Sequence, residues 1–184
     1  MCGRYVLSDT EAVEKKFKTK VPASYNIAPS QDVLVLKPKP EMIKWSYSPK
    51  WKEDMNLINC RSETIAEKPS FKGAKRCIIP FSGWYEWQKQ KDAKVPYYHY
   101  SNAKYFAGIF NDSGCCILTR ESANTLSHIH PRQPVLLQEN EIGEYFMGQN
   151  IYDSSANHDV QFYEVSKQVN SPKNNFPSLT EEIC

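Results

Sequence analysis

Short runs of aromatic and aliphatic residues, separated by turn-forming pieces, recur along most of the chain. Runs of this length and composition are typical of β-strands. The proline-containing residues 37–40 and the Asn-Asp-Ser-Gly segment at residues 111–114 are turns of the kind that separate neighbouring strands. Because the connections are too short for crossover helices, we expect a largely antiparallel sheet. The strands expected from these runs are residues 33–36, 42–47, 77–81, 84–88, 96–100, 105–110, 115–119 and 160–165.

A second pattern, apolar residues on one helical face, occurs in a few segments. Residues 8–18 begin with Ser-Asp-Thr-Glu, in which Ser8 can cap a helix and Glu11 can reach back to it. The sequence contains no internal repeat, low-complexity tract or linker. The expected fold class is therefore α+β, with residues 1–184 forming one domain around a curved, mostly antiparallel sheet or barrel flanked by short helices. The further helical stretches expected are residues 62–68, 122–129 and 138–147.

The composition limits the classes of protein to consider. The chain has 184 residues, with 23 Lys and Arg against 21 Asp and Glu, and a net charge of +2. This balance excludes a strongly basic nucleic-acid tail. No apolar run approaches the roughly 18 to 20 residues that span a bilayer, and the first residues lack the pattern of a secretory signal. We therefore expect no membrane contact and a cytoplasmic location, associated with the nucleoid if the protein is bacterial.

Positive charge gathers in one window of the chain. Residues 44–76 contain eight basic and four acidic residues, with Trp45 and Trp51 interleaved among them. This mixture is typical of single-strand nucleic-acid binding, although a solvated lysine surface over core aromatics would have the same composition. Within the window, residues 59–64 are expected to run from a strand end into a helix. Arg61 beside a helix start suits a phosphate group.

Of the six cysteines, Cys2 stands out by its position. The cysteines form no Cys-x-x-Cys pair and have no histidine at zinc-finger spacing, so we expect no metal and no cofactor. Loss of Met1 would leave Cys2 with a free α-amine beside its thiol. Reference pKa values of about 7.7 to 8.0 and 8.5 make both groups partly nucleophilic near neutral pH. Together they can trap an aldehyde as a thiazolidine or attack an amide, unless Cys2 is an ordinary residue that begins a strand.

Two other positions could transfer protons. Glu86 is the one carboxylate in an aromatic run at residues 83–87, and an inward position beside Trp84 would raise its pKa into the range of a general acid or base. The alternative is an exposed glutamate at a strand edge. His130 lies two residues before Arg132 and suits an anionic substrate. A histidine that satisfies a turn is the alternative there.

Taken in order, these segments resemble the SRAP family (SOS response-associated peptidase), whose members crosslink abasic DNA. The resemblance covers nearly the whole chain, so residues 1–184 would form a single SRAP domain. It implies that the N-terminal cysteine captures the ring-opened aldehyde of an abasic site in single-stranded DNA as a stable thiazolidine. The segments that carry the resemblance are residues 1–5, 25–29, 45–51, 59–64, 83–87, 129–134 and 169–174.

The resemblance also implies roles for single residues. Cys2 would be the nucleophile, and Asn59 would orient the opened sugar. Glu86 and His130 would shuttle protons during ring opening and Schiff-base formation. The residues that would bind DNA are Arg4, Asn26, Pro29, Trp45, Trp51, Arg61, Lys68 and Arg132. The departures from the family pattern, which affect packing or DNA fit, are Ser46, Cys60 and Gln133.

Two other functions stay open on the sequence. The Met-Cys-Gly start also resembles class II glutamine amidotransferases, whose N-terminal cysteine hydrolyses an amide, but the Asn-Gly-Glu and Arg-Gly-Pro-Asp segments of those domains are missing. The basic and aromatic surface could also belong to a single-strand binder without catalysis. We expect a monomeric enzyme of the peptidase, hydrolase or lyase class that acts once on single-stranded DNA containing an abasic site. Release of Cys2 by the chain itself or by an aminopeptidase would account for the family name.

Overall fold

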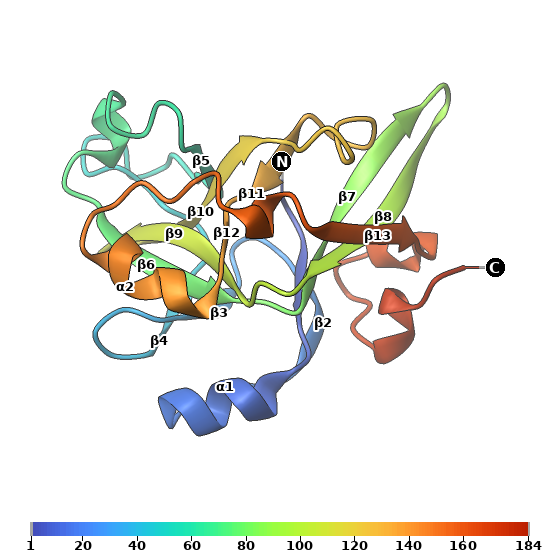
Figure 1. Ribbon diagram of the computed structural model, residues 1–184, viewed down its shortest axis with the longest axis horizontal. Helices are drawn as coiled ribbons and strands as arrows, with labels where there is room; N and C mark the ends of the chain where they lie inside the picture. The colour runs from blue at the N-terminus through green and yellow to red at the C-terminus, as the bar shows by residue number, and fades with distance from the viewer. Residues whose placement is uncertain (1, 184) are drawn as a thin grey trace.

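The computed structural model describes residues 2–183 and has an α+β fold (Figure 1). Within these residues the strands form sheets of five, six and two strands, and the α-helices are α1 (Thr10–Phe17) and α2 (Ile142–Phe146). The described strand pairings are antiparallel except for that of β5 (Asn59–Arg61) with β10 (Gly114–Glu121). The sheets of residues 2–183 do not close into a barrel. A membrane-spanning helix would need more length and more apolar surface than any helix of this part has.

The five-stranded sheet has β7 (Gly83–Gln90) at its centre. On one side β7 pairs with β8 (Ala93–Ser101), and on the other it pairs with β1 (Tyr5–Leu7). The outer strands are β13 (Val160–Glu164), next to β8, and β2 (Ser24–Ile27), next to β1. In Figure 1 the dark-blue β1 runs alongside the light-green β7. This pairing brings the start of the chain to the middle of the sheet.

The six-stranded sheet is built around β9 (Tyr105–Asn111) and β10 (Gly114–Glu121). β9 also pairs with β6 and β12, and β10 also pairs with β5 and β11. A separate hairpin joins β3 to β4. The bounds of these strands are β3 (Asp32–Val35), β4 (Glu41–Lys44), β5 (Asn59–Arg61), β6 (Lys75–Pro80), β11 (Arg132–Pro134) and β12 (Leu136–Leu137). The 3-10 helices are Pro69–Phe71, Glu139–Glu141, Ser155–Asn157, Lys167–Asn170 and Pro177–Thr180.

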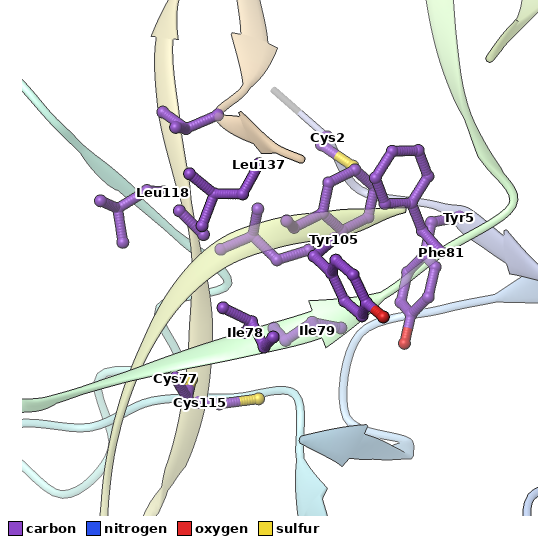
Figure 2. Packing of buried hydrophobic residues seen from close by; sticks show 14 of the residues in the cluster. Cys2, Tyr5, Cys77, Ile78, Ile79, Phe81, Tyr105, Cys115, Leu118 and Leu137 are labelled. Atoms are coloured by element: carbon purple, nitrogen blue, oxygen red, sulfur yellow. The ribbon is translucent and has the colours of Figure 1, made fainter. Parts of the chain in front are cut away.

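Alternation of side chains along β7 divides the interior into two cores. Trp84 packs into the main core, and Tyr85 packs into a second, smaller core. Figure 2 shows Cys2 together with the buried residues of the main core. Because successive residues of a strand face opposite sides, Glu86 lies on the same side of β7 as Trp84. The fold therefore directs both Cys2 and Glu86 toward the main core.

The strands expected from the sequence are confirmed, with ends that differ by a few residues. They correspond to β3, β4, β6, β7, β8, β9, β10 and β13. The strands β1, β2, β11 and β12, of two to four residues, were not expected. Strand β5 begins at Asn59, directly after the apolar residues Leu57 and Ile58, where a strand end was expected.

The first and last helical expectations are confirmed in part. Helix α1 begins at Thr10, and Ser8 does not cap it. Instead, the backbone N–H groups of Ser8 and Asp9 donate to Ser82 Oγ at 2.9 and 3.1 Å, which anchors the chain before the helix. In the stretch 138–147, a 3-10 helix leads into the short helix α2.

Residues 62–68 and 122–129 form turns, so the helices expected there are wrong. The Ser62 N–H donates to the Thr119 carbonyl at 2.8 Å and keeps the chain against β10. Ser122 N–H donates to the Pro131 carbonyl at 3.0 Å, which ties the two ends of the second segment together.

Gly83 gives a test of the packing in the second core, to which Tyr98 belongs. A Cβ at this position would lie 2.3 Å from the Tyr98 ring, whereas a Cβ at Gly143, in α2, would meet nothing within 4 Å. We expect Gly83→Ala to lower the free energy of unfolding by about 1–3 kcal/mol through overpacking. The matched control Gly143→Ala should be neutral or raise it by up to about 1 kcal/mol, because alanine favours a helix. Urea denaturation measures both, and equal stability of the two variants would contradict the packing described here.

Candidate functional site

Backbone pairing brings Cys2 next to β7. Tyr5 pairs with Trp84 in the antiparallel register, and the Tyr85 N–H donates to the Arg4 carbonyl at 3.0 Å. Continuing this register toward the start of the chain places Gly3 opposite Glu86, with Cys2 next along the chain. Cys2 lies close enough to Glu86 for the two side chains to interact electrostatically. Cys2 is fully buried, and its Sγ lies 4.0 Å from the Arg4 carbonyl oxygen. Met1 lies outside the described residues, so its removal stays a prediction.

Burial controls the protonation of both groups. Glu86 is 4% exposed, and burial raises the pKa of its carboxyl group from 4.5 to about 7. Burial also raises the pKa of the Cys2 thiol, and the negative charge of Glu86 raises it further. The inward position of Glu86, one of the two alternatives left by the sequence, is the one observed. Near neutral pH the carboxyl group can both donate and accept a proton, while the thiol holds its proton.

A pocket of about 640 Å³ is lined by Glu86, whereas the fully buried Cys2 is not among its lining residues. The pocket lies where the β7–β8 hairpin, the loop at residues 122–131 and the 3-10 helix Lys167–Asn170 meet. Gln88 Nε2 donates to the His128 carbonyl at 3.2 Å and joins the hairpin to the loop. The pocket therefore combines residues from distant parts of the chain. Its lining residues are Arg4, Glu86, Trp87, Lys89, Lys94, Ile129, His130, Pro131 and Asn170.

His130 is held in place by the backbone of Arg132. The Arg132 N–H donates to His130 Nδ1 at 3.0 Å, and the Arg132 carbonyl oxygen lies 2.9 Å from the same nitrogen. Nδ1 therefore has a partner whether or not it carries a proton. Burial lowers the pKa of His130, so the imidazole is neutral near pH 7. A half-buried, neutral imidazole on the wall of the pocket can accept a proton from a bound molecule.

Arg4 provides a fixed positive charge at the pocket. One of its terminal nitrogens donates to Asn26 Oδ1 at 2.8 Å and to the Val169 carbonyl at 2.9 Å. Its guanidinium group lies 5.8 Å from the centroid of the Trp87 ring. Asn26 is buried, and its amide donates to backbone carbonyls, including that of Asn174 at 2.8 Å. Asn26 therefore positions Arg4, and the expectation that it contacts DNA directly is wrong for this structure.

The structure also corrects the role of Trp45. This side chain is fully buried, and its indole N–H donates to the Ile58 carbonyl at 2.9 Å. A ring without exposed surface cannot stack on a base, so Trp45 belongs to the core. Trp51 is the opposite case, because it is 62% exposed. It lines a separate hollow of about 380 Å³ together with Lys50 and Lys72.

The other expected DNA-binding residues lie outside the pocket lining. Arg61 and Lys68 are exposed, and Pro29 is half-buried. Arg132 forms a two-point ion pair with Glu63, with N···O distances of 2.7 and 2.9 Å. The hydrogen bond from Arg132 is the main cause that lowers the pKa of Glu63 to about 2. The charge of Arg132 is therefore already paired within the chain.

Asn59 is placed on β5, next to β10. Its amide Nδ2 donates to the Ile58 carbonyl at 2.7 Å. Its Oδ1 is buried and finds no hydrogen-bond partner among residues 2–183. A buried acceptor of this kind is costly unless a bound molecule supplies a donor.

Some lining residues were missed by the sequence reasoning. Lys89 and Lys94 face each other across the β7–β8 hairpin, and Trp87 donates its indole N–H to Asn170 Oδ1 at 2.7 Å. The turn at residues 91–92 could have revealed the lysine pair, because a two-residue turn places residues 89 and 94 opposite each other. No local pattern in the sequence indicates the contact of Trp87 with Asn170. Within residues 2–183, no group of three or more His, Cys, Asp or Glu side chains is arranged to hold a metal ion.

The raised pKa of Glu86 predicts how stability depends on pH. The folded state favours the neutral carboxyl group, so the stability that Glu86 contributes is complete below pH 4.5 and is lost as the pH rises through 7. Glu86→Gln stays neutral at all pH values. Relative to wild type, its free energy of unfolding should therefore rise by up to about 3 kcal/mol between pH 4.5 and 8.

Denaturant unfolding across this pH range measures the difference. Glu53→Gln, at an exposed turn position, is the control and should follow the wild type. A constant difference between Glu86→Gln and the wild type would show that Glu86 ionises in the folded state as it does in the unfolded state.

Comparison with known proteins places the chain in a family. The family model described as SOS response associated peptidase (SRAP) matches residues 1–172. The abasic site processing protein YoqW of Bacillus subtilis is 32% identical, over 98% of this chain and 99% of that protein. The abasic site processing protein YedK of Escherichia coli is 28% identical over the full length of both. A crystal structure of a protein from Bacteroides thetaiotaomicron, 20% identical over both full lengths, has the same fold with a TM-score of 0.80. The chain therefore belongs to the SRAP family.

Proposed function

We propose that this protein processes abasic sites in DNA by binding single strands and capturing the lesion covalently through Cys2. The relatives named abasic site processing proteins match the chain over nearly its whole length, which supports the substrate class. The observation that carries the proposal is the position of Cys2. It is the second residue of the chain, and it lies beside a carboxyl group with a pKa of about 7 at the wall of a pocket.

The chemistry requires that Met1 be removed first. Hydrolysis of the Met1–Cys2 peptide bond, by the chain itself or by an aminopeptidase, consumes one water and frees the α-amine of Cys2. This amine attacks the aldehyde carbon of the opened sugar, and loss of one water gives an imine. The Cys2 thiol then adds to the imine carbon, and its proton passes to the nitrogen. The product is a five-membered thiazolidine, and the sequence of steps involves no oxidation or reduction.

The protonation states set the order of attack. Burial and the charge of Glu86 hold the pKa of the Cys2 thiol well above its usual range, so the thiol is a poor first nucleophile. The amine therefore forms the first bond. The thiol follows as a neutral group that brings its own proton to the ring nitrogen.

Glu86 and His130 supply the proton transfers. An abasic sugar exists mostly as a closed hemiacetal, which must lose the proton of its hydroxyl group and gain one on the ring oxygen to open. A carboxyl group with a pKa of about 7 is suited to both transfers at neutral pH. The neutral His130 can accept the proton that the amine loses as the imine forms. Asn59, whose buried Oδ1 lacks a donor among the described residues, would accept a hydrogen bond from a sugar hydroxyl group.

The exposed residues of the basic window would hold the rest of the DNA strand. Trp51 offers a stacking surface, and Arg61 and Lys68 offer charges to phosphates. Pro29 would also contact the DNA strand. Arg132 can take a phosphate when the phosphate replaces the Glu63 carboxylate.

Covalent capture is tested with a single strand treated with uracil glycosylase. We expect the wild type to give an adduct that survives heat and a denaturing gel, and the intact protein to lack the mass of one methionine. Cys2→Ser should give at most an imine that a reducing agent traps, because it lacks the thiol that closes the ring. A tag placed before Cys2 should abolish capture, because the α-amine becomes an amide.

Cys115→Ala, which removes another buried thiol, is the matched control and should capture fully. A heat-stable adduct with Cys2→Ser would refute the proposal. Binding that disappears on the denaturing gel would indicate a non-catalytic single-strand binder. Release of ammonia from glutamine would indicate an amidotransferase-like hydrolase.

The role of Glu86 is tested by single-turnover crosslinking rates. Glu86→Gln keeps the size of the side chain but cannot exchange the proton, so crosslinking should slow by roughly 10²- to 10⁴-fold. The affinity for undamaged single strands should stay nearly the same. His130→Ala should slow the reaction less where water can replace the imidazole.

Glu53→Gln serves as the control and should react at the wild-type rate. The rate of each variant is measured against pH. A wild-type rate for Glu86→Gln would assign Glu86 a structural role and require another proton donor.

A further inference from the structure

Two lysines stand opposite each other on the β7–β8 hairpin. Lys89 pairs with Lys94 in the antiparallel register, and both side chains are exposed. Like charges directly opposite each other destabilise a hairpin. Both lysines also line the pocket that contains Glu86 and His130. An anion placed between them would relieve the repulsion at the rim of the candidate site.

Within residues 2–183, no ion pair neutralises the positive charge at this rim. Among residues 2–183, no carboxylate forms an ion pair with Arg4, Lys89 or Lys94. Arg4 donates to an amide oxygen and a backbone carbonyl, both of them neutral acceptors. Three cations therefore face the same pocket. Glu86 is the acidic residue that lines it, and that residue is buried.

The rim also lies beside an open strand edge. β1 pairs with β7 at Gly83 and Trp84, and the last described bond between them is from Tyr85 N–H to the Arg4 carbonyl. From residue 86 to residue 90, β7 pairs with β8, and no described strand covers its other edge. The loop at residues 122–131 is joined to β7 at Gln88, so an extended chain of phosphates can approach this edge from residue 89 onward without meeting another strand.

We propose that Lys89 and Lys94 form a phosphodiester-binding subsite, which holds the DNA backbone next to the sugar that enters the pocket. The identification of the ligand as DNA rests on the proposed function. The subsite lies outside the basic window at residues 44–76 and shares no lining residue with the hollow at Trp51. The DNA strand would thus be held at two separate places. The resulting arrangement fixes the aldehyde carbon relative to Cys2.

The salt dependence of binding to undamaged single strands tests the subsite. For single strands, each phosphate contact contributes about −0.7 to the slope of log K against log salt. The double variant Lys89→Ala with Lys94→Ala should therefore have a slope less steep by about 1.4, which corresponds to about 25-fold weaker binding at 0.1 M salt. The double arginine variant keeps both charges and should keep the wild-type slope. Lys91→Ala, on the same hairpin but outside the pocket lining, is the matched control and should leave the slope nearly unchanged.

A second measurement locates the contact. A neutral methylphosphonate is placed at one linkage at a time on either side of an abasic site. In the wild type, neutralising one or two linkages next to the lesion should weaken binding, and in the double alanine variant the same linkages should have no effect. Equal losses in both proteins at every linkage would overturn the proposal. Thermal unfolding of the variants checks that their fold is retained.

The outcomes separate the subsite from the proposed function. If the slope changes as expected but no protein captures the lesion, the subsite stands and the covalent function fails. If capture occurs and the double alanine variant keeps the wild-type slope, the subsite is wrong. The lysines would then serve to keep other chains from pairing with the open edge of β7.

Discussion

The short pairing between β1 and β7 is the constraint on which the site depends. The hydrogen bond from Tyr85 N–H to the Arg4 carbonyl aligns the first residues of the chain with the central strand of the five-stranded sheet. This alignment sets where Cys2 and Arg4 lie relative to Glu86. Terminal residues are usually poorly ordered unless a sheet or a core holds them. Here the pairing and the burial of Cys2 provide both restraints at once.

The two cores restrain both strands that carry the candidate site. Side chains that alternate along β1 and β7 enter the main core or the second core, so neither strand can twist without disturbing both. The second core also holds the segment around Val169 that binds Arg4 and Asn26. The charged Arg4, which lines the pocket, is thus held in part by Val169, 165 positions away in the sequence. Such long-range support keeps the site in one geometry before any ligand binds.

The longer strands could be predicted from the sequence because apolar residues recur along them in a local pattern, and packing keeps these residues in the core. It could also predict Cys2, Glu86 and His130 as candidates for chemistry, since each stands out from its neighbours. It could not predict that Trp45 lies in the core, because interleaved charges look the same whether a tryptophan faces water or a backbone carbonyl. Nor could it show that the side-chain amide of Asn26 positions Arg4, because the contacts of this amide join residues that are far apart along the chain.

The burial of Cys2 has a consequence for how long an unused molecule stays active. Oxidation to a sulfenic acid begins with the thiolate and requires access to solvent. The fully buried, protonated thiol offers neither to peroxide. Under the proposed covalent capture, Cys2 reacts once and is then consumed, so it has to survive until its target arrives. The same low-dielectric surroundings that make this sulfur a slow nucleophile therefore protect it from oxidative loss during the lifetime of the protein.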